Sequence, residues 1–359
     1  MSFTEAKRRE IKNYILRKID DDDKALITKT SDAFGISATS VKRYLDAEID
    51  TGHIARDDRN KCGYSLIFNR SERKYDISGI SEREDNVLYE DIMPLLDVND
   101  NADHIWRYAL AEMFNNALEH SEGDIVDAYI ETCYLYSKIT IVDNGIGIFR
   151  KIVDTLKQYG YADPRPEDAV TELYKGKFTS CPERHTGEGI FFSMHILDRF
   201  AIVSDGYTLR CGCSDNPSFE SSHLLAYAMR LTKKGTVVVM QLENGTRREV
   251  KEVFELYSDI DDGFIKTSIP VFEALQNRDP VARSQARRLY ARLASFKEVV
   301  FDFDKVDIMG QGFADELFRV FHNMHPEVTL TPINMNEEVR MMYLHAVNNK
   351  VVIPDFSDI

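Results

Sequence analysis

Residues 110–121 read LAEMFNNALEHS, a stretch in which an acid, an amide and an imidazole recur every four positions as Glu112, Asn116 and His120. Residues four positions apart lie on one face of a helix. The apolar side chains beside this polar row predict an amphipathic helix over residues 102–120, and they are Trp106, Leu110, Met113, Phe114, Ala117 and Leu118. Asn is a mediocre helix former, so a pair of Asn inside this helix indicates that an amide is needed there. The same spacing also fits a solvated polar face.

Beyond this helix, residues 127–148 alternate as strand, turn and strand and end in DNGIGI, which begins at Asp143. A carboxylate at the end of a buried strand can accept a hydrogen bond from an exocyclic amine. Gly145 and Gly147 let the backbone approach a ligand closely. Taken alone, this turn also fits a hairpin, because Asn-Gly is a strong turn signal.

Two further glycine-containing turns follow. Gly187 and Gly189 open a predicted helix in the sequence TGEGIFFSMHIL. A helix N-terminus that follows glycines is suited to binding phosphate. Later, Gly235 and Thr236 precede an apolar strand, VVVMQL.

These four elements, in this order, resemble the N, G1, G2 and G3 boxes of the GHKL ATPases. That superfamily includes gyrase, the Hsp90 chaperones, MutL, histidine kinases and the anti-sigma serine kinases. The resemblance covers residues 85–245 and implies a GHKL α/β sandwich, a mixed sheet covered by helices, over residues 85–250.

The resemblance implies ATP and Mg²⁺ as cofactors. Asn116 would coordinate Mg²⁺, a hard cation that an amide oxygen suits, and Glu112 would act as general base on water or on an acceptor hydroxyl. His120 matches the end of the motif in anti-sigma kinases, with a structural or phosphate-proximal role. The other nucleotide contacts implied are Asp143, Gly145, Gly147, Arg184, Thr186, Gly187, Gly189 and Thr236. Among them, Asp143 would accept from the adenine amine.

Residues 149–186 would form the ATP lid of such a domain. Its cations, any of which could close on the γ-phosphate, are Lys175, Lys177, Arg184 and His185. Arg184 is the preferred candidate, and the alternative for each of them is an ordinary solvated loop charge.

The first seventy residues resemble a winged helix-turn-helix, with a polar linker at residues 71–84. Three predicted helices are followed by a predicted hairpin in the sequence ARDDRNKCGYSLIF, with Ser37 as a helix cap and Gly35 and Gly52 as helix stops. The resemblance implies that one helix faces the DNA major groove and that the hairpin contacts phosphate. The residues concerned are Thr39, Ser40, Lys42, Arg43, Arg56, Arg59 and Lys61. Use of the same fold for protein contacts remains an alternative.

Residues 251–359 alternate strand and helix, which predicts an α/β domain with a mainly parallel sheet. The run FDFDKVDIMGQGFADELF resembles STAS-like domains of the anti-sigma-antagonist type, which implies a protein partner. The turn before its helix, Met309 to Gly312, lacks the Ser or Thr that is phosphorylated in related proteins. Asp315 and Glu316 are candidates for a functional role or for simple stabilisation of the helix dipole.

Composition limits the partners. The net charge of −15 is uneven: residues 1–70 hold 14 basic against 12 acidic residues, and the remainder hold 31 against 48. Only the N-terminal segment is therefore expected to bind DNA. The five scattered cysteines predict reduced thiols, and the charged N-terminus and lack of a long apolar run predict a cytoplasmic protein without a membrane anchor.

Three functions follow as expectations. The first is an Mg-dependent ATPase whose nucleotide state controls binding of DNA or of a partner. The second is a serine/threonine kinase of the anti-sigma type that acts on a separate protein, and the third is a nucleotide-binding switch without hydrolysis. A sensor histidine kinase fits less well, because residues 69–101 contain no histidine. A homodimer is expected from both the GHKL and the winged-helix resemblance.

Overall fold

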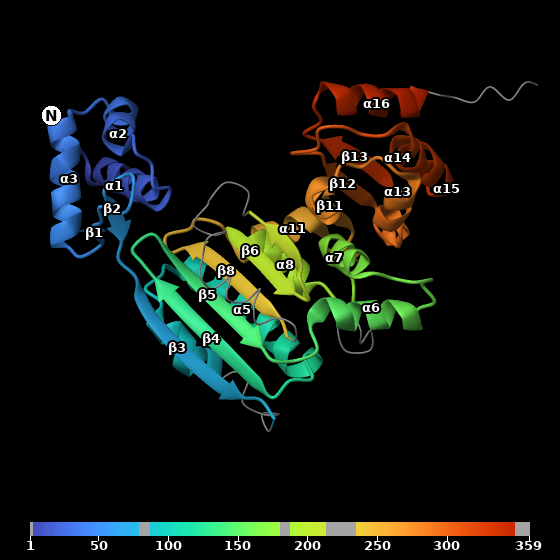
Figure 1. Cartoon of the computed structure of the whole chain (residues 1–359), viewed down its shortest axis with the longest axis horizontal. Coiled ribbons are helices and arrows are strands. Elements are labelled where there is room, and N and C mark those ends of the chain that lie inside the picture. Colours follow the sequence, from blue (N-terminus) through green and yellow to red (C-terminus); the bar gives the residue numbers. More distant parts are fainter. Residues whose placement is uncertain (1–2, 79–86, 180–186, 213–234, 349–359) are drawn as a thin grey trace, which may run out of the picture. The chain divides into compact units, whose positions relative to one another are not determined.

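The computed structural model describes residues 3–78, 87–179, 187–212 and 235–348. The chain is an α/β protein that divides into two compact units (Figure 1). The first contains residues 1–147, 193–206 and 210–250, and the second contains residues 148–192, 207–209 and 251–359.

The first unit begins with three helices and a short hairpin, in the predicted order. They are α1 (Glu5–Asp20), α2 (Leu26–Phe34), α3 (Ala38–Asp50), β1 (Ile54–Arg56) and β2 (Tyr64–Leu66), with β1 and β2 antiparallel. The cap predicted at Ser37 is confirmed, since its Oγ accepts a hydrogen bond from the Ser40 N–H at 3.2 Å. Gly35 ends α2 with a left-handed backbone at φ +62°, which a glycine adopts without steric cost.

A six-stranded sheet forms the rest of the first unit's framework, in the order β3-β4-β5-β8-β6-β7. Its strands are β3 (Asn69–Asp76), β4 (Ile125–Thr132), β5 (Tyr136–Asp143), β6 (Arg199–Ser204), β7 (Tyr207–Cys211) and β8 (Val237–Glu243). The pairs β3–β4, β4–β5, β5–β8 and β6–β8 are antiparallel. The segments η1 (Val87–Ile92) and η2 (Met93–Leu95) connect to the long helix α5.

The helix predicted at residues 102–120 is confirmed as α5 (Asp100–His120). Asn99 caps it, because its Oδ1 accepts from the Ala102 N–H at 2.8 Å. The apolar face is buried as the spacing requires, including Trp106, Met113 and Phe114. Through this face α5 packs against β5 and β8 on one side of the sheet (Figure 1).

The turn between β4 and β5 enters the core of the N-terminal helices. Cys133, Leu135 and Tyr136 are buried in one hydrophobic cluster with residues of α1, α2 and α3. The Tyr136 hydroxyl also donates a hydrogen bond to Asp20 Oδ1 at 2.8 Å. The sheet and the N-terminal helices therefore share a core.

The predicted linker at residues 71–84 is wrong in its first half, because residues 69–76 form β3. Every residue of β3 pairs with β4, from Asn69 opposite Thr132 to Asp76 opposite Ile125. The sequence NRSERKYD is polar because β3 is an edge strand whose side chains are mostly exposed. Residues 79–86 lie outside the described part of the chain.

The second unit contains a three-stranded parallel sheet, as predicted for the C-terminal segment, in the order β11-β12-β13. Its strands are β11 (Lys266–Pro270), β12 (Glu298–Asp302) and β13 (Thr329–Ile333). The helical segments after β11 are α12 (Val271–Ala274), α13 (Arg283–Tyr290), η3 (Leu293–Ser295), α14 (Gln311–Asp315), η4 (Glu316–Phe321), α15 (His322–Met324) and α16 (Glu337–Asn348).

Earlier segments of the chain belong to the same unit. They are α6 (Ile148–Gln158), α7 (Pro166–Lys175), the start of α8 (Gly189–Ile196), most of α11 (Val250–Tyr257), and the short antiparallel pair β9 (Ser258–Asp259) and β10 (Gly263–Phe264). Most of the segment expected to be an ATP lid thus groups with residues 251–359, whereas the expected boundaries assigned it to the domain at residues 85–250.

Candidate functional site

Asp143 lies at the end of β5, with only 7% of its surface exposed. Its Oδ1 accepts hydrogen bonds from the backbone N–H groups of Gly145 at 2.9 Å and of Thr236 at 3.2 Å. Burial raises the pKa of the Asp143 carboxyl, and the hydrogen bonds from Gly145 and Thr236 oppose that rise. Two of the sequence motifs, 93 positions apart, therefore meet at one buried carboxylate.

The turn after Asp143 is pressed against the end of α5. The Ile146 N–H donates to the Ser121 carbonyl at 2.8 Å, and a Cβ on Gly145 would lie 2.0 Å from that same oxygen. Gly147, at φ +90°, has Ser204 Oγ only 2.6 Å from the position of a Cβ. Both glycines are required by the packing of the protein itself, in addition to any close approach of a ligand.

Glu112 and Asn116 lie half-buried on α5, and so does His120 at its last turn. His120 Nε2 is 3.9 Å from Glu119 Oε2, an ion pair that depends on protonation of the imidazole. The neighbouring Asn115 has a buried Oδ1 without a hydrogen-bond partner. The polar face of α5 that was predicted to bind Mg²⁺ and ATP thus ends beside Ser121, whose carbonyl accepts the hydrogen bond from the turn after Asp143.

Asn144 was not predicted to have a role, and it joins two turns of the site. Its Oδ1 accepts from the N–H groups of Asp124 and Ile125 at 3.0 and 3.1 Å, and its Nδ2 donates to Asp124 Oδ1. This amide fixes the chain between α5 and β4 against the Asp143 turn.

The second glycine pair belongs to the second unit. The predicted helix start is confirmed, because α8 begins at Gly189. Gly187 has φ +75° and packs on the backbone of Phe178, whose carbonyl oxygen would lie 2.4 Å from a Cβ. Arg184, His185 and Thr186 lie outside the described residues.

Lys175 is not available to a nucleotide, contrary to the expectation for this lid cation. Its side chain is 2% exposed, and its Nζ donates to Glu172 Oε1 at 2.7 Å and to the carbonyls of Arg288 and Ala291 at 2.9 and 2.8 Å. Burial lowers the pKa of Lys175, and Glu172 opposes this change. Lys177 is half-buried, with its Nζ bonded to the Ser295 carbonyl at 3.1 Å.

The residues predicted to contact DNA lie on α3 and in the hairpin. Thr39, Lys42 and Arg43 are exposed on α3, while Ser40 is half-buried with its Oγ 3.0 Å from Ser37 Oγ. In the hairpin, Arg56 and Lys61 are exposed. Arg59 is held by Asp57, whose pKa is lowered to about 2 by the hydrogen bonds from Arg59.

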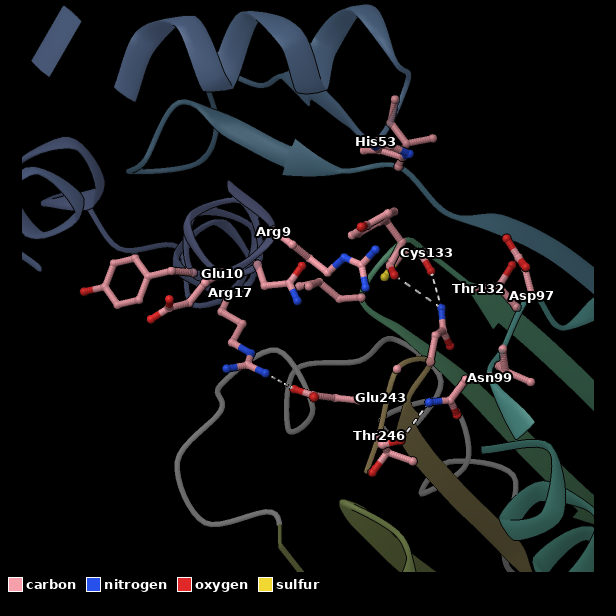
Figure 2. A pocket seen from close by; sticks show the side chains of 18 of the residues that line it. Arg9, Glu10, Arg17, His53, Asp97, Asn99, Thr132, Cys133, Glu243 and Thr246 are labelled. Atoms are coloured by element: carbon pink, nitrogen blue, oxygen red, sulfur yellow. Dashed lines mark hydrogen bonds and ion pairs between the residues drawn. The ribbon is translucent and has the colours of Figure 1, made fainter. Parts of the chain in front are cut away.

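A separate cavity of about 1230 Å³ lies between α1, the β4–β5 turn and residues 243–247 (Figure 2). Arg17 is ion-paired with Glu243 at 2.6 Å, and Asn99 Nδ2 donates to the Thr246 carbonyl at 2.8 Å. The charged side chains that line the cavity are Arg9, Arg17, Arg247, Glu10, Asp97 and Glu243. Three of these side chains are basic and three are acidic, and no predicted site residue lines the cavity.

Potential metal ligands are sparse: within the described residues, no three His, Cys, Asp or Glu side chains are grouped in a way that would hold a metal ion. No helix in the described part of the chain is both long and apolar enough to cross a membrane.

Comparison with known proteins concerns the C-terminal part of the chain. A search of curated proteins with the full sequence finds no match. Residues 285–340 match the model of a family described as a STAS-like domain of unknown function (DUF4325). This range runs from α13 through β12 and β13 into α16. The second unit therefore contains a STAS-like domain.

Proposed function

We propose that the protein is an ATP-binding regulator of the GHKL type, an Mg-dependent ATPase whose nucleotide state controls binding of DNA or of a protein partner. The observation that carries this proposal is the convergence at Asp143 of three sequence motifs. Thr236 hydrogen-bonds to the carboxylate, and the end of α5 packs on the turn that follows it. A buried carboxylate held by two backbone N–H groups is a fixed acceptor for the exocyclic amine of adenine.

The metal ligands that the protein offers fit an Mg²⁺ ion that binds together with the nucleotide. Mg²⁺ keeps most of its ligands as water and phosphate oxygens and takes only one or two from the protein. One half-buried amide, Asn116, suits that role, and the described residues offer no cluster of carboxylates that would bind the ion alone. The ion would neutralise phosphate charge, while Glu112, one turn away on α5, would accept a proton from the attacking group.

The DNA-binding part of the proposal is supported by the exposure of Lys42 and Arg43 on α3. Both cations project from a helix that follows a short turn after α2, as a recognition helix does. The STAS-like domain is the proposed site of contact with a protein partner, and a homodimer is the proposed assembly.

A nucleotide titration with a matched pair of variants tests the proposal. We expect Asn116→Ala to weaken Mg²⁺-dependent binding of a fluorescent ATP analogue to the full chain by at least about tenfold, because one ligand of the ion is lost. Asn115→Ala is the control, since the Asn115 Oδ1 has no hydrogen bond to lose. Equal affinities of Asn116→Ala and wild type in the presence of Mg²⁺ would contradict the assignment.

A further inference from the structure

Three arginines of the second unit line a cavity of about 110 Å³, and its described lining includes none of the residues proposed to bind ATP. They come from three segments: Arg165 precedes α7, Arg278 follows α12, and Arg288 lies on α13. The other lining residues are Glu167, Thr171, Ala274, Leu275 and Gln285.

Two of these guanidinium groups, those of Arg165 and Arg278, lack among the described residues the carboxylate partners that other arginines of the unit have, and the third has a distant one. Arg287 donates to Glu316 at 2.7 Å, and Arg292 donates to Glu172 at 3.2 Å. Within the described chain, Arg165 and Arg278 have no ion pair, and Arg288 Nε is 3.7 Å from Asp168 Oδ1, too far for a hydrogen bond. In a chain with 60 acidic and 45 basic residues, two arginines with no ion pair to a described residue, beside a third with a long one, are unexpected at a single cavity.

The polar side chains around the cavity that could take the place of an anion as partners of the arginines are already hydrogen-bonded or too few. Gln285 Oε1 accepts from the N–H groups of Val281 and Ala282, and its Nε2 donates to the Asp279 carbonyl. The Thr171 hydroxyl contacts the carbonyls of Glu167 and Ala274. Glu167 is the one acidic side chain on the wall and Asp168 lies beside Arg288, so three positive charges face two negative ones.

We propose that this cavity binds a small phosphate-bearing molecule through Arg165, Arg278 and Arg288. Guanidinium groups donate pairs of parallel hydrogen bonds that match phosphate oxygens, and three of them from different directions enclose a tetrahedral anion. The cavity is much smaller than the roughly 300–1,000 Å³ that encloses a drug-sized ligand, so it would hold the phosphate group itself. The bound anion would join the start of α7 to the STAS-like domain.

The arrangement complements the other end of α7. There, Lys175 already fixes the helix to α13 through the carbonyls of Arg288 and Ala291. At the start of α7, by contrast, the ion pair to the same helix, between Asp168 and Arg288, is long at 3.7 Å. An anion would turn this weak connection into a set of charge-assisted hydrogen bonds.

Calorimetric titration of the nucleotide-free full chain with inorganic phosphate, at constant ionic strength, tests the site. We expect Arg278→Gln to weaken phosphate binding by at least about tenfold and Arg278→Glu to abolish it. Arg340→Gln is the matched control, because Arg340 is exposed on α16 and has no side-chain partner in the described chain. Acetate, which has one charge and a planar shape, is expected to bind more weakly than phosphate.

The same titration separates this site from the proposed nucleotide site. Phosphate binding that survives in Asn116→Ala and is lost in Arg278→Gln supports the cavity. Binding that is lost in Asn116→Ala and kept in Arg278→Gln would place the anion at the nucleotide site and overturn the proposal. Equal binding by wild type, Arg278→Gln and Arg340→Gln, or no binding by wild type, would overturn it as well.

Discussion

Lys175 is a buried cation whose partners come from two segments of the second unit. Its ammonium group donates to the Glu172 carboxylate and to two carbonyls at the end of α13. Arg292 contacts the other oxygen of Glu172 at 3.2 Å, so one carboxylate serves two cations. A buried charge with this many partners is costly to disturb, because removing one partner leaves the others desolvated and unpaired.

We therefore expect Lys175→Met to destabilise the second unit by about 3 kcal/mol, the lower end of the range for breaking a buried ion pair, because Arg292 still compensates Glu172. Urea unfolding of the full chain measures the change. Lys157→Met is the control: Lys157 pairs with Asp154 at 2.9 Å on the surface of α6, and its loss should cost less than about 1 kcal/mol. A similar small effect for both variants would show that the Lys175 cluster contributes little.

The place of Asp143 at the end of a buried strand was predictable from the sequence, whereas the buried position of Lys175 was not. Asp143 was recognisable because its glycine turn follows an apolar strand. Lys175 was expected in a solvated lid because the segment was assigned by its place between two motifs. The nearby Glu172 was a usable signal, since an acid three positions before a lysine on a helix indicates a pair.

The helix α3 is the element that we propose binds DNA. We expect Lys42→Ala or Arg43→Ala in the full chain to weaken binding to duplex DNA and to reduce the salt dependence of binding by about one phosphate contact. Fluorescence anisotropy with a labelled duplex at several salt concentrations measures both quantities. Lys251→Ala on α11 removes the same charge elsewhere and should change neither, so an equal effect of the three variants would argue against a DNA-reading α3.

Elements with a strong apolar period were predictable, and those defined by long-range pairing were not. The helix α5 was expected within a few residues of its observed bounds, because its buried face repeats at regular spacing. The strand β3 was missed because an edge strand can be polar on both faces, and only β4 determines its conformation. The grouping of α7 with the STAS-like domain depends on tertiary contacts that no local pattern reveals.

The fate of the γ-phosphate of ATP distinguishes the possible activities of the whole chain. With γ-labelled ATP and Mg²⁺, we expect wild type to release free labelled phosphate. Glu112→Gln should reduce release by about a hundredfold or more, as is typical when a general base is removed. Release unaffected by Glu112→Gln would contradict the role of this residue. Label transferred to an added partner, in a Glu112-dependent manner, would instead indicate a kinase, and unchanged ATP would indicate a binding switch.

The strand β5 connects two regions of the first unit. Its first residue, Tyr136, lies in the core of the N-terminal helices, and its last, Asp143, is the buried carboxylate of the candidate site. The strand is paired by β4 on one side and by β8 on the other, so one continuous ladder runs from the N-terminal helices to the candidate site.

The strand β3 also determines where the chain can be divided. Only two residues separate β2, which ends at Leu66, from β3, which begins at Asn69. A fragment that begins at residue 85, after the expected linker, would lack this charged border strand and leave the backbone donors and acceptors of β4 open along one side. Open strands of this kind pair with other copies and precipitate, so the N-terminal helices and the sheet are best expressed as one piece.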